Sequence, residues 1–287
     1  MILPEFVLPS RINQCWEYSG MDSPDLCTDK KWFEQYPHTI NYYYNSRGFR
    51  DQEWPESINE LQNAVWCIGD SFTVGLGSPV EHTWPTILQQ ELNVRTINVS
   101  MDGASNQWIA RKTCEILKVI KPKILVIQWS YTYRVENSDT KLSDEDRRQK
   151  YNESTLKSTD AELLDQLKEL VELVEQNKYN AKVIHSFIPG FSFSTTASDD
   201  WSKLKGPDWP DIPTGINKFL TLPAFVQEEL KMFDKYYVFL KYAELLSSMK
   251  FVVPEFTKQD LARDGHHYDI ITARKFANQV NQLVLQA

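Results

Sequence analysis

The stretch Val65–Gly75, which reads VWCIGDSFTVG, decides the fold. Its first four residues are apolar and a glycine follows at once, which is typical of a short buried strand that ends in a tight turn. Asp70 is a residue type that caps helices, and Ser71 comes directly after it. We therefore expect a strand whose carboxyl end lies at Gly69, in a parallel sheet that binds its ligands at this edge.

The same alternation of short apolar runs and helical periodicity continues along the chain. It predicts an α/β sandwich with a parallel sheet of five strands. The expected strands are 65–68, 95–99, 124–127, 181–187 and 250–253. The expected helices are 82–92, 108–120, 161–176, 228–246 and 270–285.

The first part of the chain has a different character. Residues 1–60 lack sustained periodicity and contain five prolines, so we expect an N-terminal arm or cap packed on the body, with one short strand at 39–44. Residues 61–287 are expected to form the α/β domain. Two insertions are expected in it, near 135–160 and 189–225. The part 189–215 is rich in Pro, Gly, Ser and Trp and predicts a long irregular loop.

Composition narrows the function classes. Among 287 residues, 31 are basic and 39 acidic, which gives a net charge of −8 and disfavours a nucleic-acid partner. No run approaches the roughly 18 apolar residues that a membrane span needs. The first ten residues contain no basic segment of the kind that opens a signal peptide. We expect a cytoplasmic protein or, for a phage-encoded chain, a virion-associated one.

Ser71 is the candidate nucleophile. At the end of a strand its hydroxyl can reach the edge of the sheet, and the backbone N–H groups around it can face an oxyanion. The stretch is neither the G-x-S-x-G elbow of α/β-hydrolases nor a phosphate-binding loop, because the lysine of that loop is absent. The plain alternative is an Asp-Ser turn that caps a helix.

A candidate acid and base lie near the other end of the chain, in Asp264-Gly265-His266-His267. An aspartate three residues before a histidine can bind a ring nitrogen, fix the tautomer and stabilise the imidazolium. His267 is the expected base and His266 the competing one. Most isolated pairs of this kind are caps or surface turns. Combined with Ser71 in an α/β chain, the pair predicts a Ser-His-Asp triad at one edge of the sheet.

These motifs resemble the SGNH (GDSL-type) hydrolases, a family of esterases, lipases and carbohydrate deacetylases with a flavodoxin-like three-layer α/β/α sandwich. The resemblance extends from about residue 40 to the C-terminus. It implies that Ser71 is the nucleophile, that His267 and Asp264 are the base and its partner, and that the N–H groups of Ser71 and Gly103 form the oxyanion hole. It implies no cofactor and no metal.

One motif departs from the family pattern. After the third strand the family has Gly-x-Asn-Asp, whose asparagine completes the oxyanion hole, whereas residues 128–136 read QWSYTYRVE. Asn106 and Ser130 are the candidates for the missing donor, and the loss of one donor typically costs about 2.7–4 kcal/mol of barrier. Arg134 is expected to pair with Glu136. The candidate substrate-binding residues are Asp70, Trp129, Tyr131 and Arg134.

The expected activity is hydrolysis of small acyl esters by a serine esterase, with O-acetyl groups on carbohydrate as the preferred substrate class. The aromatic residues at 129–133 and in 189–215 suit a rim on which sugars stack. The plain alternative is that they pack the insertion. His185, at the end of an expected strand, is expected to be structural, and His38 and His82 to be surface or cap residues. Two alternatives remain. One is a non-catalytic binding or structural module, for instance a component of a virion or another assembly, and the other is an O-acetyltransferase.

Overall fold

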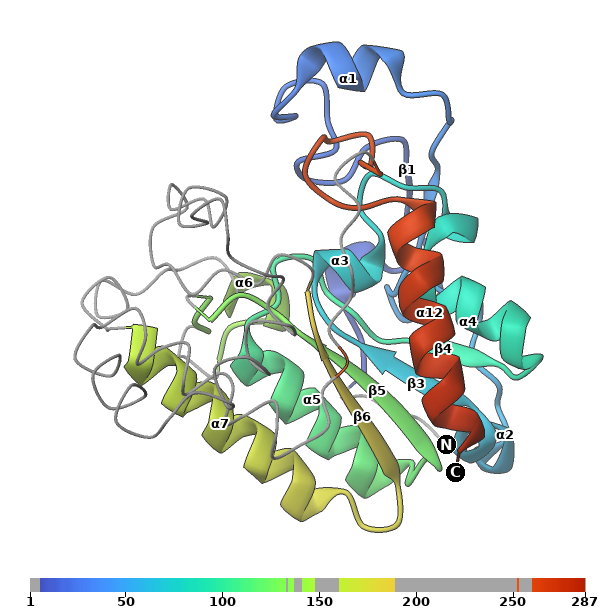
Figure 1. Ribbon diagram of the computed structural model, residues 1–287, viewed down its shortest axis with the longest axis vertical. Coiled ribbons are helices and arrows are strands. Elements are labelled where there is room, and N and C mark those ends of the chain that lie inside the picture. The colour runs from blue at the N-terminus through green and yellow to red at the C-terminus, as the bar shows by residue number, and fades with distance from the viewer. Residues whose placement is uncertain are drawn as a thin grey trace, which may run out of the picture.

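The computed structural model describes residues 6–132, 134–136, 141–147, 160–188, 252 and 260–286. A four-stranded parallel sheet lies at its centre (Figure 1). Its strands are β3 (Val65–Ile68), β4 (Thr96–Asn98), β5 (Ile124–Trp129) and β6 (Lys182–Phe187). All four lie where the apolar runs predict them, and the α/β fold with a parallel sheet is confirmed.

The order of the strands across the sheet is β4-β3-β5-β6. Val65 is in register with Thr96 on one side and with Ile124 on the other. Beyond β6, Val252 forms a parallel bridge with Ser186. Val252 belongs to the expected fifth strand, whose other residues lie outside the described part. The order 2-1-3-4, with a fifth position after it, is the flavodoxin-like winding that the family resemblance implies.

Helices cover both faces of the sheet, which makes a three-layer sandwich (Figure 1). Helix α4 (Trp84–Leu92) packs against α12 (Ile270–Leu285) on one face, and α5 (Asn106–Val119) packs against α7 (Asp160–Asn177) on the other. Each presents an apolar stripe to the core, as in α12, where Phe276 meets Trp84 edge to face with ring centroids 4.9 Å apart. The sandwich therefore buries its apolar surface between three layers.

We call the described residues up to 60 the N-terminal segment. Part of this segment, which includes residues 28 and 40–44, lies near the carboxyl edge of the sheet. Strand β1 (Cys15–Trp16) pairs antiparallel with β2 (Tyr42–Tyr43), a shorter strand than the one expected at 39–44. The remaining elements before β3 are η1 (Pro9–Arg11), α1 (Lys30–Gln35) and α2 (Ile58–Asn63). A small apolar cluster, which includes Tyr42 and Leu76, joins the N-terminal segment to residues 74–76, which follow β3. The division of the chain at residue 60 stays a prediction.

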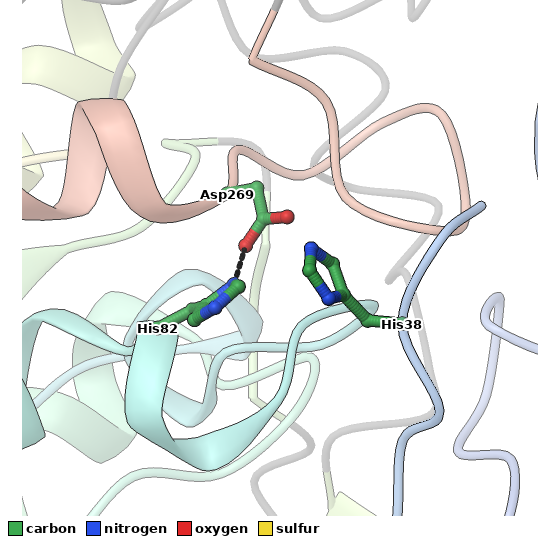
Figure 2. A group of neighbouring side chains, drawn as sticks. All are labelled: His38, His82 and Asp269. Atoms are coloured by element: carbon green, nitrogen blue, oxygen red, sulfur yellow. Dashed lines mark hydrogen bonds and ion pairs between the residues drawn. The ribbon is translucent and has the colours of Figure 1, made fainter.

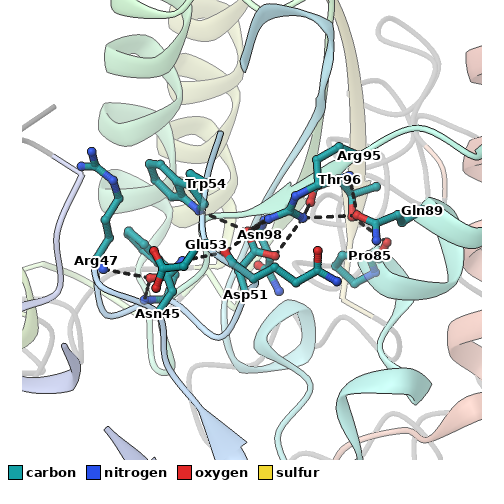
Figure 3. Close-up of polar contacts among 12 residues, drawn as sticks. Asn45, Arg47, Asp51, Glu53, Trp54, Pro85, Gln89, Arg95, Thr96 and Asn98 are labelled. Carbon is teal, nitrogen blue, oxygen red and sulfur yellow. Dashed lines mark hydrogen bonds and ion pairs between the residues drawn. The ribbon is translucent and has the colours of Figure 1, made fainter. Parts of the chain in front are cut away.

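A polar network fastens the end of the N-terminal segment to strand β4 (Figure 3). The Asp51 carboxylate accepts two hydrogen bonds from the Arg95 guanidinium, at 3.0 and 2.9 Å. It also accepts the backbone N–H of Asn98 at 3.2 Å and the indole N–H of Trp54 at 3.1 Å. Because these donors satisfy the carboxylate, Asp51 can lie at the buried edge of the sheet.

Three short elements lie between the longer ones: α3 (Ser71–Val74), η2 (Val80–His82) and α6 (Asp144–Arg147), the last within the expected insertion near 135–160. The expected loop 189–215, the insertion 189–225, the helix 228–246 and Tyr133 lie outside the described residues. No helix in the described ranges has both the length and the apolar character needed to cross a membrane.

Candidate active site

The turn after β3 presents Ser71 at the carboxyl edge of the sheet. Asp70 is the N-cap of α3, and its side chain accepts the N–H of Phe72 at 3.0 Å. Gly75 ends the helix in the left-handed conformation, with φ 75°. Gly69 has no room for a side chain, because an added Cβ would lie 2.2 Å from Thr73 Oγ1 and 3.0 Å from the Gln128 carbonyl oxygen. The local sequence thus holds Ser71 in a tight strand-to-helix turn.

A loop before α12 brings Asp264 and His267 to the same edge. Asp264 Oδ1 accepts the backbone N–H groups of His266 and His267, both at 2.9 Å. Asp264 Oδ2 lies 2.5 Å from His267 Nδ1, and His267 Nε2 lies 2.8 Å from Ser71 Oγ. Because a carboxylate only accepts, Nδ1 carries the proton and Nε2 can accept the proton of the serine. The three predicted residues form one hydrogen-bond chain.

The charge of Asp264 favours protonation of His267, as a general base requires. Burial alone raises the pKa of Asp264, but the adjacent His267 lowers it to about 2 through its charge and hydrogen bonds. Burial alone lowers the pKa of His267, but the charge and hydrogen bond of Asp264 outweigh it and leave this pKa raised. His266 is exposed and meets Asp264 through its backbone N–H. The geometry therefore favours His267 over His266 as the base.

Residues of the N-terminal segment hold the loop that carries Asp264 and His267. Thr28 Oγ1 donates to the carbonyl of Asp264 at 2.8 Å, and the Trp32 indole N–H donates to the carbonyl of Ala262 at 2.7 Å. Asp22 accepts two hydrogen bonds from Arg263, both at 2.7 Å. Sequence reasoning missed these residues, because no local pattern links positions more than 200 residues apart.

Two backbone N–H groups are available for an oxyanion. Ser71 is the first residue of α3, where the N–H lies outside the helical ladder, and Gly103 has φ 69° in the turn after β4. Neither N–H donates a hydrogen bond to another residue of the described ranges. The N–H of Met101 donates to the carbonyl of Gly69, so the turns after β3 and β4 lie side by side.

Asn106 and Ser130, the expected additional oxyanion donors, are engaged elsewhere. The Asn106 side chain accepts the N–H of Ser130 at 2.8 Å and donates to the carbonyls of Ser130 and Tyr131. The Ser130 hydroxyl donates to Asp70 Oδ2 at 2.5 Å. Since a hydroxyl has one proton, Ser130 has none left for a substrate oxygen. These hydrogen bonds of Asn106 and Ser130 stabilise the turn after β5.

Two of the expected substrate-binding residues lie inside the protein, and the expectation is corrected for both. Trp129 is fully buried, and its ring stacks on that of His185. Asp70 is fully buried as well, and its carboxylate binds Ser130 and Arg134. Tyr131 is half-buried in the turn after β5, with the Arg134 guanidinium 4.8 Å above its ring. Tyr131 and Arg134 therefore remain candidates.

The ion pair expected between Arg134 and Glu136 is not formed. Arg134 Nη1 lies 2.7 Å from Asp70 Oδ2, whereas Glu136 pairs with Arg111 at 2.5 Å and with Arg147 at 3.3 Å. The buried carboxylate of Asp70 is the stronger partner, because a charge inside the protein has to be paired.

His185 is structural, as expected from its position at the end of a strand. The indole N–H of Trp129 donates to His185 Nδ1 at 3.1 Å. Because tryptophan only donates, the proton of the neutral ring lies on Nε2, which donates to Glu175 at 3.0 Å. Both ring nitrogens are used and the ring is buried. The hydrogen bond from His185 is the main reason why the pKa of Glu175 falls to about 2.

An α/β sandwich with a serine, a histidine and an aspartate hydrogen-bonded in series at the carboxyl edge of its sheet has the constellation of a serine hydrolase. No protein-family model and no curated protein matches the sequence. The structural neighbours are GDSL-type lipolytic esterases and carbohydrate esterases, at low sequence identity.

Three of these neighbours show the level of similarity. A lipolytic protein of the G-D-S-L family from Desulfitobacterium hafniense is 14% identical, with a TM-score of 0.43 over 77% of this chain and 99% of its own. The esterase EstA from a Pseudoalteromonas species is 13% identical, with a TM-score of 0.43 over 78% and 100%. A carbohydrate acetylesterase family member from Sinorhizobium meliloti is 15% identical, with a TM-score of 0.44 over 78% and 98%. At these values the likeness carries no argument about activity, which has to come from the geometry.

Proposed function

We propose that this chain is a serine esterase that hydrolyses small acyl esters through an acyl-enzyme. The observation that carries the proposal is the hydrogen-bond chain from Asp264 through His267 to Ser71. A solvated turn or a helix cap has no need of this arrangement, because Ser71 Oγ, the imidazole and the carboxylate are all buried. Buried polar groups in series, with a nucleophile at one end, are what acyl transfer requires.

The mechanism follows from the positions of the protons. His267 Nε2 takes the proton of Ser71 as Oγ attacks the ester carbonyl, and the N–H groups of Ser71 and Gly103 receive the oxyanion. The imidazolium is stabilised by Asp264 and gives its proton to the leaving alcohol. Water, activated by the same imidazole, then attacks the acyl-enzyme and releases the acid and Ser71.

The proposed substrate class is O-acetyl groups on carbohydrate. The half-buried ring of Tyr131, with the Arg134 guanidinium over it, lies next to the ring of Phe72, which directly follows the nucleophile. An aromatic ring with a cationic donor suits the apolar face and the hydroxyl groups of a sugar. The aromatic residues of 189–215 in the sequence support the same substrate class.

One observation favours the second candidate, a non-catalytic module on the same fold. Asn106 and Ser130, the side chains expected to supply a further oxyanion donor, are committed to other partners. If the chain is an esterase with only two backbone oxyanion donors, we expect it to be slow. If it is a non-catalytic module, we expect it to bind its ligand at the same edge of the sheet without turnover.

Hydrolysis of p-nitrophenyl acetate and of an O-acetylated xylo-oligosaccharide by the full chain tests the proposal. We expect turnover by the wild type and a loss of about 10³-fold or more in Ser71→Ala, with Ser143→Ala, directly before the short helix α6, unchanged. Equal rates for wild type and Ser71→Ala in folded protein would exclude the triad. Transfer of acetyl to an added acceptor sugar, in place of release as acetate, would identify an O-acetyltransferase.

A further inference from the structure

Three segments far apart in the sequence bring together His38, His82 and Asp269, none of which belongs to the Ser71-His267-Asp264 triad (Figure 2). His38 lies between α1 and β2, His82 ends η2, and Asp269 directly precedes α12. Each offers one ligand atom, and these atoms all lie within 4.8 Å of one another. Two imidazoles and a carboxylate are the donor types that zinc prefers in proteins.

The Asp269 carboxylate is turned away from the helix that it precedes. Although Asp269 occupies the N-cap of α12, its side chain makes no capping hydrogen bond. Asp260 supplies the cap instead, since its two carboxylate oxygens accept the N–H groups of Ile271 and Thr272. Asp269, which is only 7% exposed, is thereby left to face the histidines. Because Asp260 caps the helix in place of Asp269, the Asp269 carboxylate is available for a role other than capping.

The surroundings of Asp269 match those of a metal-binding carboxylate. Its Oδ1 lies 2.7 Å from His82 Nδ1, and its Oδ2 accepts the Tyr36 hydroxyl at 2.5 Å. A hydrogen bond to the second oxygen is the usual support of a carboxylate ligand. The His38 and His82 rings meet edge to face, with centroids 4.8 Å apart. His38 is exposed, so water and an ion can reach the group.

We propose that His38, His82 and Asp269 bind a divalent transition metal ion, with zinc favoured by the donor set. Two neutral imidazoles and one carboxylate give three ligands, and water takes the fourth position of a tetrahedron. Ligand atoms at zinc distances lie about 3.3 Å apart, so the His82–Asp269 pair opens slightly to admit the ion. The Tyr36 hydroxyl stays on the second carboxylate oxygen.

The ion would fasten the N-terminal segment to the body. His38 belongs to that segment, whereas His82 and Asp269 belong to the body, and Asp269 lies two residues beyond His267. Thr28 and Trp32 already bind the same loop by hydrogen bonds. The site is thus structural, and it stands whether or not the chain proves to be an esterase.

Titration of the metal-free full chain, without a histidine tag, with ZnCl₂ in a calorimeter tests this proposal. We expect one ion per chain with a dissociation constant of about 10 μM or tighter, and a higher melting temperature in its presence. His38→Ala, an exposed substitution with little risk to folding, should weaken binding at least tenfold, and so should Asp269→Asn. Co²⁺ in place of Zn²⁺ should give the visible absorption of a tetrahedral site.

The matched control is His266→Ala, which removes another exposed histidine of the same region. It should bind Zn²⁺ within about twofold of the wild type. Folded wild type that binds no zinc at about 100 μM would overturn the proposal and leave His82–Asp269 as a simple ion pair. Loss of binding in His266→Ala with binding retained in His38→Ala would also overturn it, because the ion would then lie at the Ser71 site.

Discussion

Ser71 is held by residues adjacent to it in the sequence. The loop that carries His267 is held instead by Thr28 and Trp32, which come 236 and 230 positions before the residues whose carbonyls they bind. The Ser71 turn lies between β3 and α3, and its cap, Asp70, is the adjacent residue. The His267 loop depends on Thr28 and Trp32 of the N-terminal segment. The nucleophile is therefore a local feature of the fold, and the base is a product of long-range packing.

The largest effect is expected within the triad itself, from Asp264→Asn. The amide cannot stabilise the imidazolium, and it favours the wrong tautomer, so the rate should fall by about 10³–10⁴-fold. Only neutral His267 accepts the serine proton, so activity rises as the pH rises through the His267 pKa. Asp264 raises this pKa, so removing its charge should also shift the acid limb of the profile to lower pH. The pH dependence of ester hydrolysis measures both effects.

A change of rate without this shift of the acid limb would contradict the assignment of Asp264 as the partner of His267. Asp264→Glu, which keeps the charge, is the control. It should keep the acid limb near that of the wild type even if its rate is reduced.

A smaller effect, confined to the nucleophile turn, is expected from Gly69→Ala. The new Cβ would lie 2.2 Å from Thr73 Oγ1 and 3.0 Å from the carbonyl of Gln128, so the turn has to shift. Overpacking of this kind typically costs about 1–3 kcal/mol of stability. Urea unfolding gives the loss of stability, and ester hydrolysis gives the loss of rate. Unchanged stability and rate would show that the tight turn does not position Ser71.

The smallest effect, but the one that separates the two regions, is expected from Thr28→Val. Valine keeps the shape of threonine and removes the hydrogen bond to the carbonyl of Asp264, which we expect to cost about 0.5–1.5 kcal/mol. Thr28→Ser, which keeps the hydroxyl, is the matched control. We expect a several-fold loss of ester hydrolysis in the valine variant and near wild-type activity in the serine variant. Equal activities would mean that the N-terminal segment does not position the loop.

The same contrast explains how much the sequence predicts. The strands and helices follow from local periodicity, and β3 begins and ends where its apolar run does. Ser71, His267 and Asp264 could be proposed because each lies in a short motif at the end of a predicted strand or before a predicted helix. Their approach to one another could be expected because parallel strands share a carboxyl edge.

The remaining features depend on tertiary partners that no local pattern contains. Trp129 is a residue type on which sugars often stack, but here it is buried. It ends the central strand β5, and its indole N–H donates to His185. Arg134 binds the buried carboxylate of Asp70 rather than nearby Glu136. No local pattern predicts this pair, because Asp70 is 64 positions earlier in the chain. The placement of His38 next to Asp269 depends on the path of the whole N-terminal segment.

Labelling of the folded full chain with a fluorophosphonate probe tests the central claim, an activated Ser71, most directly. The probe phosphonylates a serine only where a base takes its proton, and mass spectrometry locates the modified residue. We predict modification of Ser71 in the wild type and none in Ser71→Ala or His267→Ala. A folded wild type that stays unlabelled at Ser71 would contradict the account and favour the non-catalytic module.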